Sequence, residues 1–350
     1  MAVRVLLIGN FDGHRLQGRT YNTDHKLRNG LIRAGHQVIA IDERATARWL
    51  APLGMKPWGR RRLRREVVAT ARHHRPHLVV LGHTDLLGVS GYAALREALP
   101  DARFACYFVD AFTPLRRNLE RLRQRAAFMD AVFATTADPE IIQPFAPRAH
   151  LFWYMPNAVD PAVEVGRADR HPRTALSYDG IFLGTDIDRR REQIESLQNG
   201  LPSDYRLRVG GRRVGDERLT GPAFLELLAD AAVSPQLPRD DTDANAMRRF
   251  CTSARIAQTM GQGVLALTPT ALQLEGLYED GIISFTSRKD LVEQMLALRD
   301  DDERRRQIAA RGREIAHSRT NAPRIARYMV ETVFERPLSE DYGWPTDPLV

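Results

Sequence analysis

The chain has 350 residues, which is enough for two domains of ordinary size. Hydrophobic residues make up 43% of it and charged residues 27%, a balance that is typical of folded globular proteins and argues against extensive disorder. No apolar run approaches the roughly 20 residues of a membrane span, and the short apolar run at the N-terminus predicts a first strand rather than a signal peptide.

The two cysteines, Cys106 and Cys251, lie far apart in the sequence, and neither belongs to a pattern of metal ligands. This favours a reducing compartment and argues against both a disulfide framework and a structural zinc site. We therefore expect a cytoplasmic protein.

The net charge of +7 favours anionic partners, namely nucleotides, nucleic acids or an acidic membrane surface. The densest basic cluster is Arg60–Arg65. One interpretation is a solvated helix face; the other is a patch that holds the protein on anionic lipid, at the inner face of the membrane. Nucleic acid is not an expected partner, because the cluster has no interleaved aromatic residues and no known nucleic-acid module is visible.

In the first half of the chain, short apolar runs alternate with helical patterns, which is typical of a parallel sheet covered by helices on both faces. The predicted strands are Val3–Gly9, Gln37–Asp42, Leu78–Leu81, Arg103–Val109, Ala131–Ala134 and Leu151–Tyr154. The predicted helices are Arg19–Ala34, Arg61–His74, Gly91–Leu99, Leu115–Phe128 and Pro139–Phe145.

A Pro- and Asn-containing break then predicts an interdomain linker at residues 156–176, after which a second alternating series begins. Its predicted strands are Asp179–Gly184, Arg206–Val209, Ala232–Pro235, Val264–Leu267 and Ile282–Phe285. Its predicted helices are Asp188–Gln198, Pro222–Ala229, Asn245–Met260, Arg288–Leu298, Asp302–Ala316 and Ala322–Phe334. The Pro-rich residues 336–350 predict an irregular tail.

These patterns predict an α/β protein with two Rossmann-like, doubly wound parallel-sheet domains that face a cleft. The first domain would comprise residues 1–155 and the second residues 177–335. In such sheets ligands bind beyond the C-terminal ends of the strands, and a cleft between two domains is a preferred ligand site.

Several segments carry a resemblance to a known family, among them residues 290–292 and 302–316, which match its C-terminal series. Residues 253–268, reading SARIAQTMGQGVLALT, resemble the donor-site helix and following strand of GT-B glycosyltransferases, most closely those of the CgeB-like spore-maturation branch. Residues 274–281 resemble the acidic turn of these enzymes, and residues 156–160 (PNAVD) resemble their linker. Phe182-Leu183-Gly184, followed by Arg189-Arg190-Arg191, is similar to their strand-to-helix turn.

The resemblance implies a glycosyltransferase that moves a sugar from a nucleotide-sugar donor on the second domain to a glycan or lipid-linked acceptor on the first. Many retaining members carry paired glutamates on the donor helix, and here those positions are Phe250 and Gln258. Two alternatives stay open. One is another GT-B enzyme such as a sugar-nucleotide epimerase, and the other is a non-catalytic module that binds sugar nucleotides.

The resemblance also implies a set of donor-binding residues. A guanidinium at Arg255 can bind a diphosphate with two hydrogen bonds, and Arg190 or Arg191 can reach a phosphate at a helix N-terminus. The amide of Gln258 can bond ribose hydroxyls. Ordinary helix-surface roles are the alternatives for these residues. The full predicted set is Gly184, Arg190, Arg191, Arg255, Gln258 and Glu275.

Asp186-Ile187-Asp188 matches the Asp-x-Asp pattern that holds a divalent cation in GT-A glycosyltransferases. Helix capping is the favoured interpretation, because a metal motif should lie in a nucleotide-binding first half. We therefore expect no metal and no cofactor, with arginines and a helix N-terminus stabilising the leaving diphosphate.

Polar residues follow several predicted strands of the first domain. Asn10 and Asp12 lie after the first strand, while Tyr21 and Asn22 open the next helix; these four are predicted to line an acceptor pocket or to cap the helix. A base for the acceptor hydroxyl must be a histidine or a carboxylate within hydrogen-bond reach. The candidates at later strand ends are His83, Asp85 and Asp110.

Overall fold

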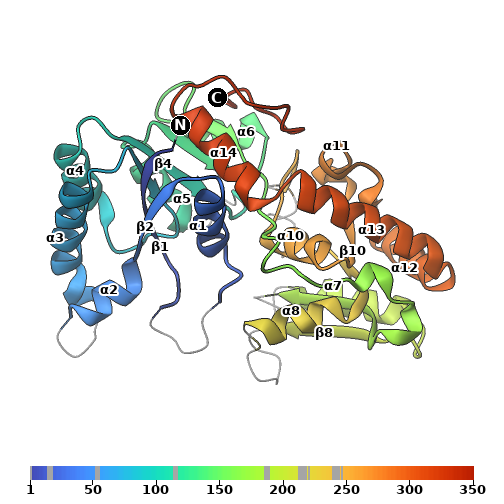
Figure 1. The fold of residues 1–350 in the computed structure, drawn as a ribbon. Helices are drawn as coiled ribbons and strands as arrows, with labels where there is room; N and C mark the ends of the chain where they lie inside the picture. Colours follow the sequence, from blue (N-terminus) through green and yellow to red (C-terminus); the bar gives the residue numbers. More distant parts are fainter. Residues whose placement is uncertain are drawn as a thin grey trace. The chain divides into compact units, whose positions relative to one another are not determined.

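The computed structural model in Figure 1 describes residues 2–13, 19–51, 56–112, 117–184, 190–211, 219, 221–238, 245 and 247–350. The chain forms two compact units. The first unit comprises Met1–Ala134, Asp138–Met155 and Ala322–Val350, and the second comprises Thr135–Ala137 and Pro156–Asn321. Each is built around one parallel sheet, which confirms the predicted fold class of two doubly wound α/β domains.

The sheet of the first unit has six parallel strands in the order β2-β1-β3-β4-β5-β6. Their bounds are β1 Arg4–Gly9, β2 Gln37–Asp42, β3 Leu78–Leu81, β4 Arg103–Phe108, β5 Ala131–Ala134 and β6 Phe152–Tyr154. The central strands are continuous apolar runs that are buried on both faces, as a helix-covered parallel sheet requires. The strand order reverses at β1, between β2 and β3, and such a reversal opens a crevice beyond the strand ends.

The helices of the first unit cover this sheet. Their bounds are α1 Thr23–Arg33, α2 Glu43–Trp49, α3 Lys56–His74, α4 Gly88–Ala98, α5 Arg117–Ala126, α6 Pro139–Ile142 and α14 Ala322–Val333.

The C-terminal helix α14 packs on the first unit, which differs from the domain boundary expected from the sequence. It crosses α1 at Gly30, where a Cβ atom would lie 2.3 Å from the carbonyl oxygen of Ala322, so only a glycine admits this approach. The tail after α14 has no helix or strand but is anchored as well. Leu349 N–H donates to Phe152 O (2.7 Å), next to the edge strand β6. Residues 156–176, predicted as a linker, group with the second unit.

The second unit has a five-stranded parallel sheet in the order β11-β10-β9-β7-β8. Its strands are β7 Tyr178–Gly184, β8 Leu207–Gly211, β9 Ala231–Pro235, β10 Leu265–Pro269 and β11 Ile283–Phe285. Its helices are α7 Arg191–Gly200, α8 Pro222–Ala229, α10 Ala254–Gly261, α11 Glu275–Tyr278, α12 Arg288–Asp300 and α13 Asp302–Ser318. Short 3-10 helices across both units are Gln143–Phe145, Ala168–Arg170, Arg173–Ala175, Thr270–Leu272 and Glu279–Gly281.

Helix α10 is shorter than the helix predicted over Asn245–Met260, because local backbone geometry delays its start. Arg249 and Phe250 have φ angles of 40° and 57°, in the left-handed region that an α-helix cannot contain. Ser253 then caps the helix, since its hydroxyl accepts a hydrogen bond from the amide of Ile256 (3.2 Å).

Candidate functional site

A pocket of about 230 Å³ lies at the C-terminal edge of the sheet in the first unit. The three residues predicted as base candidates, His83, Asp85 and Asp110, all contribute to its wall. The complete lining is Arg44, Gly82, His83, Thr84, Asp85, Tyr107, Phe108, Val109, Asp110, Asn118, Arg121 and Arg125. The wall is therefore built from the last residues of β4 and the residues that follow β3 and β4, with cationic side chains from α2 and α5.

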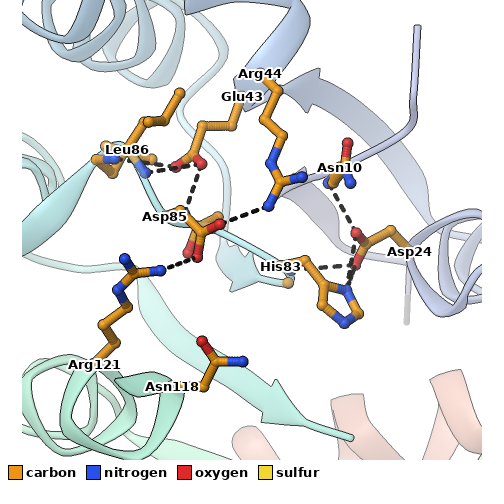
Figure 2. A network of polar contacts seen from close by, with 12 residues as sticks. Asn10, Asp24, Glu43, Arg44, His83, Asp85, Leu86, Asn118 and Arg121 are labelled. Atoms are coloured by element: carbon orange, nitrogen blue, oxygen red, sulfur yellow. Dashed lines mark hydrogen bonds and ion pairs between the residues drawn. The ribbon is translucent and has the colours of Figure 1, made fainter. Parts of the chain in front are cut away.

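A buried carboxylate, Asp24 in the first turn of α1, orients the histidine of this pocket. Asp24 accepts hydrogen bonds from the backbone amide of Asn10 (2.8 Å) and from Nδ1 of His83 (3.1 Å), as Figure 2 shows. It also accepts one from the hydroxyl of Tyr107. A carboxylate beside Nδ1 holds the proton of a neutral imidazole there and leaves a lone pair on Nε2. The side chain of His83 is 43% exposed.

The same carboxylate makes His83 a stronger base. Burial on its own would lower the pKa of His83, but the charge and hydrogen bond of Asp24 outweigh this effect, with a further contribution from Asp110. The net pKa of His83 is raised above its ordinary value.

Two glycines make room for Asp24 between the strand ends. A Cβ atom at Gly82, directly after β3, would lie 2.3 Å from Oδ1 of Asp24 and 2.4 Å from the hydroxyl oxygen of Tyr107. A Cβ atom at Gly9, the last residue of β1, would lie 2.9 Å from the carboxylate carbon. The buried carboxylate fits at this edge because glycines stand at the last position of β1 and directly after β3.

Asp85 is held as an anion and is a weak base. It accepts hydrogen bonds from Arg44 (2.6 Å) and Arg121 (2.9 Å), one on each carboxylate oxygen (Figure 2). Burial would raise the pKa of Asp85, but Arg44 and then Arg121 and Arg125 outweigh it, so the net pKa is lowered. Of the predicted base candidates, this one is least suited to accept a proton.

The loop that carries His83 and Asp85 is held in place by Glu43, a fully buried carboxylate at the start of α2. Glu43 accepts hydrogen bonds from three consecutive backbone amides, those of Asp85 (2.6 Å), Leu86 (2.9 Å) and Leu87 (3.0 Å). Buried Arg125 holds the same loop from α5, donating to the carbonyl oxygens of Gly82 and Thr84.

The third base candidate, Asp110, lies on the loop after β4 and is half-buried. It accepts a hydrogen bond from Asn118 on α5 (3.2 Å). Its negative charge raises the pKa of His83 across the pocket.

The four predicted acceptor residues lie after β1 and mostly serve local structure. Asn22 caps α1, accepting from the amide of His25 (3.0 Å), which is the capping alternative that the sequence left open. Asp12 pairs with Arg19 (2.9 Å). Asn10 and Tyr21 are buried beside them, and the amide of Asn10 bonds Asp24.

In the second unit, three predicted donor residues gather around the ring of Phe182 at the end of β7. The guanidinium carbons of Arg255 and Arg190 lie 4.5 Å and 5.6 Å from the ring centroid. A Cβ atom at Gly184 would lie 3.1 Å from Nη1 of Arg255. Nε of Arg255 also donates to the side-chain oxygen of Gln236 (2.9 Å), the residue after β9.

Gln236 is a residue that the sequence did not single out. Its side chain is buried, and its Nε2 donor has no hydrogen-bond partner among the described residues. A buried donor without a partner costs about 1–3 kcal/mol, a penalty that a bound acceptor group would remove. The amide donor of Gln236, beside Arg255, is thus a group that a bound acceptor could engage.

The other donor candidates are more dispersed. Gln258 is buried one turn after Arg255 on α10, and Arg191 is exposed at the start of α7. Glu275 is exposed at the start of α11 and accepts a hydrogen bond from the hydroxyl of Ser284 on β11. Asp186, Asp188 and Arg189 lie outside the described residues. Within the described part of the chain, no group of three or more metal-ligating side chains is placed to hold an ion.

Comparisons with known proteins agree with this architecture. Residues 189–331, which run through the second unit from α7 and include most of α14, match the family described as "Glycosyl transferase-like". No curated protein sequence matches the chain.

Several solved structures share the fold over nearly the whole chain. HepE from Anabaena in complex with UDP-glucose has a TM-score of 0.62 at 14% identity, covering 95% of this chain and 100% of that one. Sucrose-phosphate synthase from Thermosynechococcus elongatus has a TM-score of 0.62 at 11% identity, with 95% and 98% covered. An alpha-glucosyltransferase in complex with UDP-glucose and DNA has a TM-score of 0.60 at 11% identity, with 95% and 100% covered. At these identities the likeness establishes the GT-B fold.

Proposed function

We propose that this protein is a glycosyltransferase of the CgeB-like branch, which moves a sugar from a nucleotide-sugar donor to an acceptor hydroxyl. The donor binds the second unit and the acceptor, a glycan or a lipid-linked saccharide, binds the pocket of the first. The Asp24–His83 pair at the edge of that pocket carries the proposal, because it is a preformed base at a strand end. The glycosyl transferase-like match over residues 189–331 supports the same activity.

The reaction is a displacement at the anomeric carbon. Nε2 of His83 accepts the proton of the acceptor hydroxyl, and the hydroxyl oxygen forms a bond to the anomeric carbon. The bond from that carbon to the diphosphate oxygen breaks, and the electron pair leaves with the nucleotide. Asp24 stabilises the imidazolium that forms, because its buried carboxylate already accepts the Nδ1 proton.

On the donor side, Arg255 and Arg190 neutralise the diphosphate, and the free amide donor of Gln236 bonds a phosphate or sugar oxygen. Arg191 and the backbone at Gly184 complete the phosphate site, while Gln258 and Glu275 bond ribose or sugar hydroxyls. We propose that no metal takes part, since arginines supply the positive charge. The test is transfer activity in EDTA, which should persist; loss that manganese or magnesium restores would favour a cation at Asp186 and Asp188.

The structural neighbours bound to UDP-glucose make it the first donor to examine. Ligands that bind only the folded state raise its stability, so a thermal-shift panel of UDP-, GDP-, ADP-, dTDP- and CMP-sugars should identify the donor. The matching donor should then release its nucleotide slowly to water in the native protein and not in His83→Ala.

Three results of this assay separate the alternatives. Nucleotide release that depends on His83 supports glycosyl transfer. Conversion of the donor to an epimer without lasting transfer would indicate an epimerase. Binding without any turnover, in the presence of a broad panel of saccharide acceptors, would indicate a non-catalytic module.

A further inference from the structure

We propose that the outer surface of α2 and α3 is a membrane-docking surface, which inserts two tryptophans into an anionic bilayer. The surface consists of Arg48, Trp49, Trp58, Arg61, Arg62 and Arg65. It lies on the first unit and shares no side chain with the pocket of His83, so its activity as a lipid-binding surface can be tested separately from sugar transfer.

The periodicity of α3 separates two faces. Leu63, Val67 and Ala71 recur at helical spacing and are fully buried against the first unit. Trp58, Arg61, Arg62 and Arg65 recur at the same spacing on the opposite side, and all four are exposed. The helix thus holds a tryptophan and three arginines outward along one stripe.

Helix α2 adds a second tryptophan to this stripe, because the two helices are in tight contact. A Cβ atom at Gly59 would lie 1.9 Å from the carbonyl oxygen of Ala47, so the backbones touch where α3 begins. Nη1 of Arg62 donates to the carbonyl oxygen of Leu50 (3.0 Å), the residue directly after Trp49. This hydrogen bond ties the end of α2, which carries Trp49, to Arg62 of α3. Figure 1 shows α2 at one end of α3.

The two indoles are unusually exposed for such large apolar groups. Trp49 is 85% exposed and Trp58 is 56% exposed. An indole is amphipathic, and tryptophan is enriched at the level of lipid headgroups, where its ring is buried and its N–H remains hydrated. Exposed to water, the two indoles contribute no burial energy, whereas insertion into a bilayer would remove their apolar area from water.

The charge of the surface selects an anionic bilayer as the partner. Glu66 is the only exposed acidic side chain of α3. Within the described part of the chain, neither Arg61 nor Arg65 forms an ion pair. Basic residues held near an anionic headgroup layer each strengthen binding about fivefold, and apolar insertion adds to this. Among the described residues no helix is long and apolar enough to cross the bilayer.

The experiment is co-sedimentation of the full chain with phosphatidylcholine vesicles, with and without phosphatidylglycerol. We expect binding only to the anionic vesicles, and weaker binding in about 1 M salt, where the Debye length falls to about 3 Å. Arg61→Ser with Arg65→Ser should lower the partition coefficient about 30-fold. Trp49→Ser with Trp58→Ser should lower it at least about tenfold and abolish the blue shift of tryptophan fluorescence on binding.

The matched control carries Arg288→Ser and Arg304→Ser, two exposed arginines of the second unit with the same loss of charge. It should bind as the native chain does. Equal loss in the control, retention of binding in the tryptophan variant, or no binding of the native chain at low salt would each overturn the proposal. Binding of a single-stranded oligonucleotide in place of vesicles would also overturn it, in favour of a nucleic-acid site.

Discussion

The substitution Asp24→Asn tests the pair on which the proposed chemistry rests. It keeps the shape of the side chain and removes its negative charge. The carboxamide can accept a hydrogen bond with only one of its two polar atoms, while four donors converge on Asp24 in the native protein: the amides of Asn10 and His83, Nδ1 of His83 and the hydroxyl of Tyr107. The amide nitrogen would therefore face a donor or would turn toward Nδ1 of His83.

The expected effect follows from the burial of Asp24. The carboxylate is fully buried, so water cannot replace the lost charge. A hydrogen bond to a charged group contributes about 1.5–3 kcal/mol, which corresponds to about 10- to 150-fold in rate. An amide that donates to Nδ1 would also move the imidazole proton to Nε2, and this would add to the loss.

Two measurements follow the change. The first is the pH titration of the His83 ring by NMR, in which the native pKa should exceed that of a free imidazole and Asp24→Asn should lower it. The second is the rate of nucleotide release from the donor as a function of pH. The acid limb of this pH–rate profile should move to lower pH, together with the pKa of His83. Asp130→Asn is the matched control, because Asp130 bonds Arg96 and the amide of Phe104 in the same unit and does not contact His83.

The reasoning is refuted if Asp24→Asn leaves both the titration of His83 and the rate unchanged. It is also refuted if Asp130→Asn lowers the rate as much, because the effect would then report stability and not the base. A stability measurement on each variant separates the two cases, since the native pair stabilises the fold most below the pKa of an unfolded histidine. That contribution is lost as the pH rises through the raised pKa of the folded state.

Three further predictions concern the rest of the chain. Arg255→Ala should weaken donor binding by about 1.5–3 kcal/mol in calorimetry, with Arg288→Ala unchanged; equal affinities would reject the assignment. Burial would raise the pKa of Asp179, but Arg206 and then Arg173 lower it to about 2, so Asp179→Asn should cost roughly 2 kcal/mol at neutral pH in urea unfolding. This difference in the free energy of unfolding should be present above the pKa of an unfolded aspartate and should disappear as the pH falls toward 2. A difference that does not change with pH would contradict the prediction. Burial raises the pKa of Cys106 to about 11, so iodoacetamide should not modify it in the native state at neutral pH, as mass spectrometry can check.

The strands could be predicted because their pattern is local. Leu78–Leu81 is an uninterrupted apolar run between turn residues, and it is strand β3 with the same bounds. The packing of α14 on the first unit could not be predicted, because its apolar stripe indicates that one face is buried but not which domain covers it. The contact of Gly30 with Ala322 joins positions almost 300 residues apart, and no sequence feature near either residue predicts it.

The candidate site shows the same division between local and distant information. His83 and Asp110 were identified because each follows a strand, and strand ends of a parallel sheet converge. Asp24 was not among the predicted site residues, because an acidic residue in the first turn of a helix is common for dipole reasons. Gly9 and Gly82, whose lack of a side chain admits Asp24 at the strand ends, were not singled out from the sequence.

The arrangement assigns different tasks to two carboxylates that lie on either side of His83. Asp85 bonds two arginines, and its net pKa is lowered, so it remains an anion and accepts no proton. Asp24 bonds the imidazole and raises its pKa, so His83 is the group that we propose as acceptor of the proton of an acceptor hydroxyl. Because Glu43 fixes the loop between them through three backbone amides, the base and the anion keep their separate environments. If Asp85 lacked its two arginine partners, it could compete with His83 for the proton. Arg44 of α2 and Arg121 of α5 lower its pKa and so remove this competition.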